Sequence, residues 1–339
     1  MMINIETENL TRTYETYRKP EGLLKSIQGL WARKVEQKVA VHPTTLSIAK
    51  GEIVGLVGSN GAGKTTLLKL LSGLIHPSGG SAKVLGYAPT SRDPEFLKRI
   101  SILLGQKNQL WWDLPPADSY DLLARIYEIN PIEARSRVRE LAELLQCSEQ
   151  LHVQLRRLSL GERMKMEIIG ALLHQPEVLF LDEPTIGLDI IAQTTIREFL
   201  ATYVKERKPT LILTSHYMDD ISLLADRLLL ISQGSIVYDG SVEEFVAKAE
   251  NRQTLSLKLL NPPTTDVSIA GHFQLEAGTR NIKVELAANV IGDVLQALMS
   301  LSPVQEIKIE EVEFEDVIHS FMQQDARMRA SSSAPAARV

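Results

Sequence analysis

The stretch Gly58–Thr66, "GSNGAGKTT", decides the fold that this sequence predicts. It matches the pattern G-x-x-x-x-G-K-[ST], in which glycines let the backbone wrap closely around a phosphate group. The apolar run "EIVGLV" before it predicts a strand, and "TTLLKLLSGL" at its end predicts a helix. Because strand, loop and helix follow in the order that the pattern requires, we favour a phosphate-binding loop over a glycine-rich turn that matches by chance.

Each part of this loop has an expected task. The helix N-terminus supplies aligned N–H groups, Lys64 reaches the outer phosphates, and the Thr65 hydroxyl can ligate Mg²⁺. The predicted ligand is therefore a phosphate compound together with its Mg²⁺ ion. The residues expected to hold it are Gly58, Ser59, Asn60, Gly61, Ala62, Gly63, Lys64, Thr65 and Thr66.

Length and composition predict a folded protein of two domains, since the 339 residues are 44% hydrophobic and 23% charged. Over residues 1–245, short apolar runs alternate with helical patterns, which predicts an α/β domain with a largely parallel sheet and a helical insert at about 107–175. Strand and helix patterns over 250–324 predict a small α+β domain. The segment 325–339 is rich in Ala, Ser and Arg, so we expect a disordered tail.

Charge and cysteine content exclude some functions. The net charge of −5 is not the footprint of a nucleic-acid binder, so we expect no nucleic-acid partner. The single cysteine, Cys147, excludes an intramolecular disulfide and fits a reducing compartment. Because no run approaches 18 apolar residues and the first residues lack the blocks of a signal peptide, we expect any membrane role to depend on a partner.

Two adjacent carboxylates follow the apolar run in "VLFLDEPTIGLD". Neighbouring residues of a strand point to opposite sides, so we expect Asp182 to hold Mg²⁺ and Glu183 to be the base that orients or deprotonates water. Gln106 and His216 also follow predicted strands and could reach the same sheet edge. A solvated acidic strand end, or a structural Gln and His, is the alternative for each taken singly.

The stretch "LSLGE" opens a second predicted helix with Ser159 and Gly161. A serine cap and a small residue at a helix start suit a site where backbone N–H groups face an anion. The chain already has one phosphate loop, so this helix start raises the question of which phosphate it would meet.

In order, the phosphate loop, Gln106, "LSLGE", the Walker B strand with Glu183, "GLD" and His216 resemble the ATP-binding-cassette (ABC) ATPases over residues 1 to about 245. The resemblance implies that ATP and Mg²⁺ lie between two cassettes paired head to tail. Ser159 and Gly161 would then contact the γ-phosphate held by the opposite subunit. The family motif is LSGGQ, and here Leu160 and Glu162 replace its second Gly and its Gln, a departure that bears on affinity more than on competence.

The resemblance also implies roles for other residues. Asp189 would cross the interface, His216 would contact the γ-phosphate on its own phosphate loop, and Tyr14 would stack on adenine, with Tyr17 the weaker candidate. The catalytic set is Glu183, His216, Lys64 and Gln106. The magnesium ligands are Thr65, Gln106 and Asp182. The nucleotide contacts beyond the phosphate loop are Tyr14, Ser159, Gly161, Glu162 and Asp189.

The segments "GQKNQLWWDLP", "DEPTIGLDIIAQ" and "EVEFEDVIHSF" resemble ATPases of ABC-2-type exporters, in particular bacterial ones linked to drug or viologen efflux. This implies a peripheral subunit on the cytoplasmic face of the inner membrane, paired with a second cassette, most simply in a homodimer, and with one or two kinds of permease subunit. An ATPase for a polysaccharide or lipid-linked cargo, or a soluble cassette acting on ribosomes or DNA, is the alternative. A degenerate scaffold is disfavoured because Lys64, Asp182, Glu183 and His216 are all present.

Two features are expected to face the membrane subunits. Trp111 and Trp112 stand together in a Pro-containing loop, and we expect at least one to line a groove for a permease helix, the alternative being that both cap the helical insert. Between about residues 20 and 38, apolar and basic residues predict an amphipathic element that packs on a permease or lies among lipid headgroups. Its apolar stripe is Leu23, Leu24, Ile27, Leu30 and Trp31, and its basic residues are Lys25, Arg33, Lys34 and Lys38.

The alternative for this element is a helix folded back on its own cassette, and its likeness to the extra helix of polysaccharide-exporting ABC ATPases keeps that cargo open. Changing Leu24, Ile27 and Trp31 to Ser should leave folding and ATP binding intact, because the stripe is lost without touching the phosphate loop. Co-purification with the membrane subunits, or coupled transport, should fall. Unchanged assembly and transport would refute the docking role.

Overall fold

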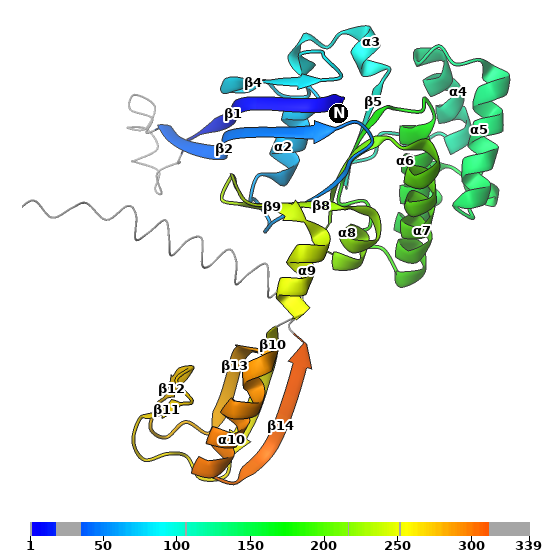
Figure 1. Cartoon of the computed structure of the whole chain (residues 1–339). Helices are drawn as coiled ribbons and strands as arrows, with labels where there is room; N and C mark the ends of the chain where they lie inside the picture. Colours follow the sequence, from blue (N-terminus) through cyan, green and yellow to red (C-terminus); the bar gives the residue numbers. More distant parts are fainter. Residues whose placement is uncertain (1, 18–34, 106, 216, 251, 312–339) are drawn as a thin grey trace, which may run out of the picture. The chain divides into compact units, whose positions relative to one another are not determined.

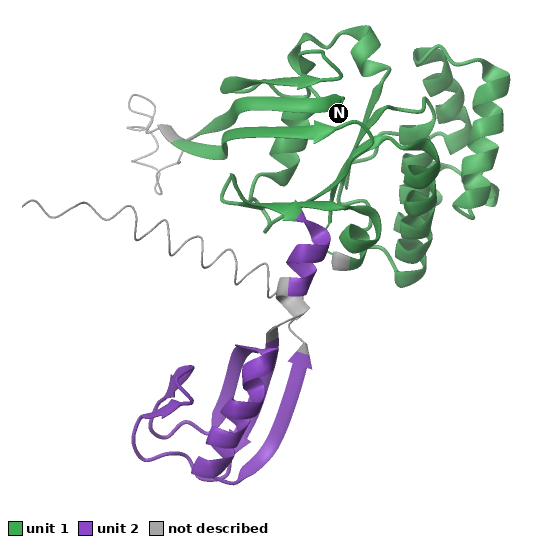
Figure 2. Ribbon diagram, in the orientation of Figure 1, with its two compact units in different colours: residues 1–240 green, residues 241–339 purple. Residues whose placement is uncertain are grey.

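The computed structural model describes residues 2–17, 35–105, 107–215, 217–250 and 252–311. The chain forms two compact units, Met1–Gly240 and Ser241–Val339 (Figure 2). Most of the predicted amphipathic element, the predicted last helix and the predicted tail lie outside the described residues. Within the described part of the chain, no helix has the length and apolar content needed to span a membrane.

A six-stranded sheet in the order β5-β6-β7-β3-β8-β9 forms the centre of the first unit (Figure 1). Neighbouring strands from β5 to β8 run parallel. Every residue of β6 and β7 is buried, as expected for parallel strands with both faces covered. The strands are β3 (Ile53–Val57), β5 (Ile100–Leu104), β6 (Val178–Asp182), β7 (Thr210–Thr214), β8 (Arg227–Ser232) and β9 (Ser235–Ser241).

A second sheet of the first unit is antiparallel, with the order β2-β1-β4 (Figure 1). Helix α2 (Lys64–Leu71) shares one apolar core with strands of both sheets, including Ile5, Ile48 and Phe180. Its leucines are almost fully buried, because a helix between two sheets needs an apolar surface on more than one side. The strands of this sheet are β1 (Ile3–Tyr17), β2 (Val35–Ala49) and β4 (Gly79–Val84).

Helices α6 (Leu160–Leu172), α7 (Ile190–Arg207) and α8 (Met218–Leu224) also belong to the first unit. Helix α8 approaches β3 at Gly55, where a Cβ atom would lie 2.7 Å from the Cγ2 atom of Ile221. A side chain at Gly55 would therefore push this helix away from the strand that leads into the phosphate loop.

The predicted helical insert is present between β5 and β6. Asn130 caps its second helix by accepting a hydrogen bond from the N–H of Ile132 at 2.9 Å. The buried Tyr120 hydroxyl donates to the carbonyl oxygen of Met166 at 2.9 Å and joins the first helix to α6. The elements of this region are α4 (Pro116–Ile126), α5 (Pro131–Leu144), η2 (Ser148–His152), η3 (Leu155–Arg157) and α6, whereas η1 (Pro89–Ser91) and α3 (Pro94–Leu97) precede β5.

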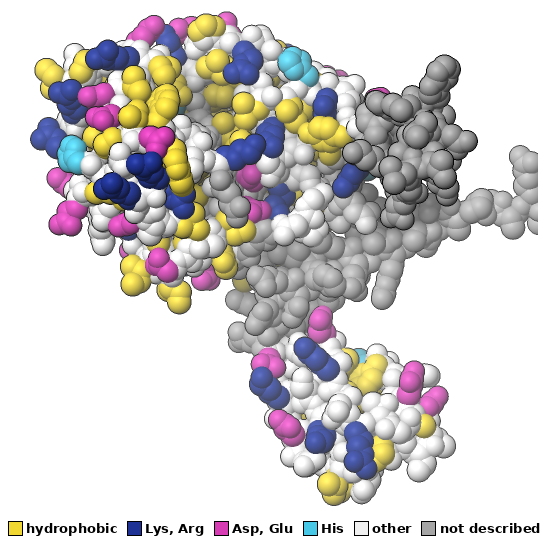
Figure 3. All heavy atoms as spheres, turned by 180° about the vertical axis from the view of Figure 1, so that it is seen from behind, with side chains coloured by type: hydrophobic (Ala, Val, Ile, Leu, Met, Phe, Trp, Pro, Cys, Tyr) yellow, Lys and Arg dark blue, Asp and Glu magenta, His cyan; other side chains and the backbone are white. Residues whose placement is uncertain are grey.

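The second unit is α+β, as predicted. Its main sheet has the order β13-β10-β14, and apolar residues of β10 form a core with Val294 and Leu298. Figure 3 shows basic and acidic side chains interspersed over the visible described surface of both units. The elements are α9 (Val242–Glu250), β10 (Arg252–Leu259), β11 (Val267–Ile269), β12 (Phe273–Leu275), β13 (Asn281–Ala287), η4 (Ala288–Val290), α10 (Ile291–Leu301) and β14 (Val304–Glu311).

The predicted amphipathic element extends too far at its C-terminal end. Residues 35–38 form the start of β2, where Lys38 pairs with Tyr14 and Val35 pairs with Tyr17. The physical reason is that the antiparallel pairing of β2 with β1 continues as far as Val35 and satisfies the backbone N–H and C=O groups of this segment.

His174 is held neutral where the helical insert meets the sheet. Its Nε2 atom lies 2.9 Å from the carbonyl oxygen of Ile100, which requires a proton on that nitrogen, and its ring stacks on Tyr127 with centroids 3.9 Å apart. Burial lowers the pKa of His174 to about 4. Between this value and the ordinary histidine pKa of about 6.5, the unfolded chain binds the extra proton, so stability is lost as the pH falls through that window.

We therefore predict a pH-dependent stability that depends on His174. Wild-type protein should lose about 2 kcal/mol of unfolding free energy through this residue between about pH 7 and pH 4.5. His174→Gln can still donate to the carbonyl of Ile100 but cannot titrate, so its loss over that range should be smaller by about this amount. Urea unfolding at several pH values measures the difference, with the exposed His76→Gln as control. Equal pH dependence in wild type and His174→Gln would contradict the assignment.

Candidate functional site

The carboxyl ends of parallel strands bring predicted site residues to one edge of the central sheet. The phosphate loop follows β3, Asp182 is the last residue of β6, and Thr214 is the last residue of β7. Ligands of open α/β sheets bind at this edge. Gln106, which follows β5, and His216, which follows β7, lie outside the described residues, so their roles stay predictions.

The phosphate loop has its shape because two positions exclude a side chain. A Cβ atom at Gly63 would lie 2.4 Å from the carbonyl oxygen of Ala40, and φ at Gly63 is 113°, which side chains rarely adopt. A Cβ atom at Gly58 would lie 2.3 Å from the carbonyl oxygen of Ile231. Helix α2 then begins at Lys64 without a side-chain cap, so the N–H groups of its first turn are available to an anion.

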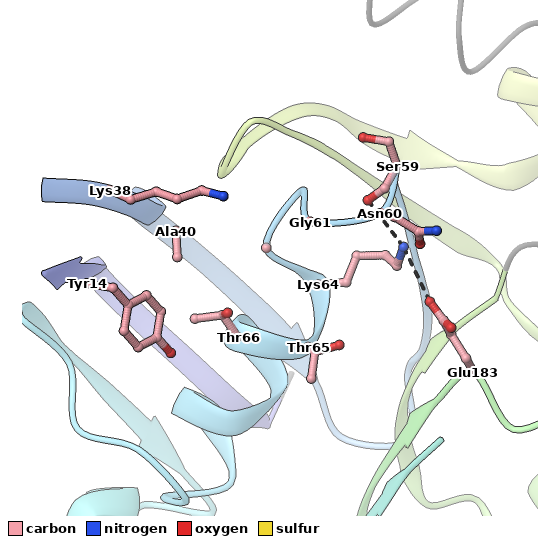
Figure 4. A pocket seen from close by; sticks show the side chains of 11 residues that line it. Tyr14, Lys38, Ala40, Ser59, Asn60, Gly61, Lys64, Thr65, Thr66 and Glu183 are labelled. Atoms are coloured by element: carbon pink, nitrogen blue, oxygen red, sulfur yellow. Dashed lines mark hydrogen bonds and ion pairs between the residues drawn. The ribbon is translucent and has the colours of Figure 1, made fainter. Parts of the chain in front are cut away.

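Lys64 crosses the loop and is only 4% exposed. Its Nζ atom donates to the carbonyl oxygen of Gly58 at 2.6 Å and lies 3.5 Å from Oε1 of Glu183 (Figure 4). The lysine charge is therefore placed between the loop that would hold phosphate and the carboxylate that is the predicted base.

Asp182 is held by two hydroxyl groups. The Thr65 hydroxyl donates to Oδ2 at 2.7 Å, and the Thr214 hydroxyl donates to Oδ1 at 2.9 Å. A carboxylate and a threonine hydroxyl are oxygen ligands of the kind that Mg²⁺ takes when phosphate oxygens and water supply the others. The residues present therefore fit a magnesium ion bound with a nucleotide.

Glu183 has a left-handed backbone conformation, with φ at 54°. Its N–H group donates to the hydroxyl of Thr214 at 2.9 Å and lies 3.1 Å from the carbonyl oxygen of that residue. Thr214 thereby contacts both Asp182 and Glu183 and supports their placement. Thr214 is not among the residues predicted from the sequence, although its place at the end of the strand "TLILT" was a usable signal.

A cavity of about 290 Å³ runs from the phosphate loop to Tyr14 (Figure 4). The guanidinium carbon of Arg12 lies 4.6 Å from the centroid of the Tyr14 ring, so a cation covers one face of the ring. Lys38 reaches the cavity from β2, whereas the side chain of Tyr17 lies outside the described part of the chain. The lining residues are Tyr14, Lys38, Ala40, Ser59, Asn60, Gly61, Gly63, Lys64, Thr65, Thr66 and Glu183.

Ser159 and Glu162 form a reciprocal cap at the start of α6. The N–H of Glu162 donates to the Ser159 hydroxyl at 3.3 Å, and the N–H of Ser159 donates to the Glu162 carboxylate at 2.8 Å. The hydrogen bond from the Ser159 backbone is the main cause that lowers the pKa of Glu162, and Gln150 donates to its other oxygen at 3.0 Å. Glu162 thus serves the helix cap in this chain.

Gly161 lies against the start of α7. A Cβ atom there would lie 2.8 Å from the Cβ atom of Ala192 and 3.6 Å from Oδ2 of Asp189. Asp189 caps α7 by accepting from the N–H of Ala192 at 2.9 Å. The structure therefore brings the two helix starts together, and Ser159, Gly161, Glu162 and Asp189 do not line the cavity at the phosphate loop.

Trp111 and Trp112 are 42% and 43% exposed. The guanidinium carbon of Arg163, on α6, lies 5.0 Å from the ring centroid of Trp112. Both indoles thus keep an accessible face. That they line a groove for a partner stays a prediction.

Comparison with known proteins identifies the family of the chain. Residues 41–186 match the family described as ABC transporter. The chain is 34% identical over 204 residues to the ABC transporter ATP-binding protein NatA of Bacillus subtilis (strain 168), an alignment that covers 60% of this chain and 82% of NatA. It is 36% identical over 214 residues to the doxorubicin resistance ATP-binding protein DrrA of Mycobacterium tuberculosis (strain ATCC 25618 / H37Rv), covering 62% of this chain and 63% of DrrA.

Solved structures show the same fold. One is the dimeric post-hydrolysis state of the ATP-binding cassette MJ0796 bound to ADP and Pi, with a TM-score of 0.59 and 21% identity, covering 70% of this chain and 98% of that one. Another is cbiO1 from Clostridium perfringens, with a TM-score of 0.58 and 24% identity, covering 73% of this chain and 92% of that one. At these identities the likeness concerns the fold alone.

The position of Thr214 leads to a test of how the two carboxylic residues are held. Thr214→Val keeps the shape of the side chain but removes a donor to Asp182 and an acceptor for the N–H of Glu183, which should cost about 1 to 3 kcal/mol of unfolding free energy. Thr214→Ser retains the hydroxyl and should lose clearly less. Urea unfolding measures both variants, and equal losses would show that the hydroxyl does not support the site.

Proposed function

Since the chain belongs to the ABC transporter family and is an ATP-binding, ATP-hydrolysing transport subunit, we propose that it drives an ABC-2-type exporter of drug-like or other amphipathic compounds. The observation that carries the catalytic part of this proposal is that Lys64, Thr65 and Glu183 line one cavity, with Asp182 hydrogen-bonded to Thr65. The relative named for doxorubicin resistance supports the class of cargo. A polysaccharide or lipid-linked cargo is the second candidate.

In this proposal each residue has one task in hydrolysis. The N–H groups at the start of α2 and the Lys64 ammonium bind the outer phosphates, and Tyr14 stacks on the base at the other end of the cavity. The Thr65 hydroxyl and the Asp182 carboxylate hold Mg²⁺, which neutralises phosphate charge when bound. Glu183 orients a water toward the γ-phosphate or takes its proton.

The contact between Lys64 and Glu183 bears on this division of tasks. At 3.5 Å from the carboxylate, the lysine ammonium forms an ion pair with Glu183. An ATP phosphate is a strong competitor for the ammonium group because it carries more negative charge. Nucleotide binding is thus expected to draw Lys64 toward phosphate and leave Glu183 to the attacking water.

A second cassette is part of the proposal. Ser159, Gly161 and Asp189 do not line the cavity of their own chain, as expected if they meet the nucleotide of another copy. Next to Asp189, Ile190 and Ile191 are 80% and 79% exposed, and adjacent exposed isoleucines suit an interface. Solved cassettes of this fold include dimers. The simplest arrangement is a homodimer with two complete sites.

Attachment to membrane subunits completes the proposed function. The chain would sit on the cytoplasmic face of the membrane, where permease subunits of one or two kinds convert the closing and opening of the cassette pair into export. The exposed faces of Trp111 and Trp112 support a docking place on the helical insert.

The catalytic assignment predicts different outcomes at two positions. Glu183→Gln should keep ATP binding and lower turnover about 10²- to 10⁴-fold, because it removes the base but not the phosphate contacts, and should accumulate as an ATP-bound dimer. Lys64→Ala should weaken ATP binding itself, since it removes a charge that contacts the bound ground state. Isothermal titration, steady-state hydrolysis and size-exclusion chromatography measure these effects.

Lys83→Ala is the matched control for Lys64→Ala, because Lys83 is exposed on β4 and does not line the cavity. It should bind and hydrolyse ATP as the wild type does. Turnover of Glu183→Gln at the wild-type rate would overturn the role of Glu183. Unchanged ATP affinity in Lys64→Ala would overturn the site as a whole.

A further inference from the structure

Glu167 is a buried carboxylate in the middle of α6 and is only 5% exposed. Its two oxygens lie 3.0 to 3.3 Å from the backbone nitrogens of Gln109 and Leu110, which donate to them. A carboxylate that accepts two consecutive N–H groups satisfies its own charge and the backbone of the loop together. The buried face of α6 is thus joined to the backbone of Gln109 and Leu110 through the carboxylate of Glu167.

The loop held by this carboxylate follows the strand β5 and the residue Gln106. The Nε2 atom of Gln109 donates to the carbonyl oxygen of Ile102 on β5 at 2.6 Å. Leu110 is buried against α6, since a Cβ atom at Gly170 would lie 3.1 Å from its Cδ2 atom. The segment is therefore fixed to β5 by one side chain and to α6 by Glu167 and an apolar contact.

We propose that Glu167 is a positioning residue that ties the loop Lys107–Leu110 to helix α6, so that the loop and the helix move as one body. The inference rests on the proposed function, in which Gln106 and Ser159 serve nucleotides at two different sites. The tie would transmit a displacement at the end of β5 to the start of α6. A change at one nucleotide site would then alter the position of residues at the other nucleotide site.

The tie depends on the ionised form of Glu167, because protonation turns one of its two acceptor oxygens into a donor that faces N–H groups. Burial raises the pKa of Glu167 to about 7, against the lowering effect of the two N–H groups and of Arg163 one turn earlier on α6. The other titratable group that faces it is the buried Tyr120 of α4. The tie should therefore weaken as the pH falls from about 8 to about 6.

The test compares the full-length wild type with three variants. Glu167→Gln has one acceptor oxygen in place of two, and Glu167→Asp has a carboxylate that is one methylene shorter. Glu143→Gln, at an exposed position of α5, is the control. At pH 8, kcat for ATP hydrolysis should fall about tenfold in the first two variants, with ATP affinity changed less than about twofold. At pH 6 the ratio of wild type to Glu167→Gln should approach one, because wild-type Glu167 is then neutral as well. Glu143→Gln should follow the wild type throughout.

A merely structural role would lower the activity of Glu167→Gln by the same factor at every pH, and this result would overturn the proposal. A wild-type rate of Glu167→Gln at pH 8 would overturn it as well. A second measurement does not need hydrolysis. In a Trp31→Phe background the remaining tryptophans, Trp111 and Trp112, adjoin the tied loop and report on it. Their fluorescence should change with a midpoint near pH 7, and this transition should vanish with Glu167→Gln.

The two measurements separate this inference from the proposed function. Absence of ATP hydrolysis in the wild type would refute the proposed function. The fluorescence transition would still test whether Glu167 holds the loop Lys107–Leu110 on α6. A transition that persists unchanged in Trp31→Phe/Glu167→Gln would overturn the tie and leave the ATPase assignment in place. If Glu167→Gln does not fold, Glu167→Asp takes its place in the kcat comparison at pH 8, where a wild-type rate overturns the proposal.

Discussion

The carboxylate of Asp182 is the group on which the rest of the site depends. One oxygen accepts from Thr65 at the start of α2 and the other from Thr214 at the end of β7, so a single side chain joins the phosphate loop, β6 and β7. The same Thr214 hydroxyl accepts from the N–H of Glu183. Because these bonds lie at the carboxyl edge of a parallel sheet whose strands are buried, the two carboxylic residues have little freedom to move independently.

The parts of the fold and site that could be predicted are those written in short, local patterns. The phosphate loop is one: its glycines are needed because Ala40 and Ile231 leave no room for a Cβ atom, and the spacing of the motif records that constraint. The adjacent Asp182 and Glu183 at the end of an apolar strand are another. Alternating strand and helix patterns sufficed for the α/β fold, since the central strands β6 and β7 are buried on both faces and read as continuous apolar runs.

The parts that could not be predicted depend on pairing between distant segments. Lys38 reaches the cavity because β2 pairs with β1 in a register that sets it opposite Tyr14, and no local pattern encodes that register. Thr214 matters because β7 lies beside β6 in the sheet order, although the two are separated by a helix in sequence. The cap of α6 is different, because Ser159 and Glu162 fit the local capping-box pattern S-x-x-E and this role of Glu162 could have been predicted from the sequence.

Helix α6 carries two glutamates whose environments act in opposite directions. Glu162 accepts from the N–H of Ser159 at the helix start, where the helix dipole also favours a negative charge, and its pKa is lowered. Glu167 lies in the interior of the protein, where burial outweighs two hydrogen bonds and raises its pKa to about 7. Near neutral pH the Glu162 carboxylate of the helix cap is thus charged, whereas the Glu167 carboxylate, which accepts from the loop after β5, is only partly charged. Near neutral pH the helix start therefore keeps its charged cap, whereas a change of pH alters the hydrogen bonds that join the helix to the loop after Gln106.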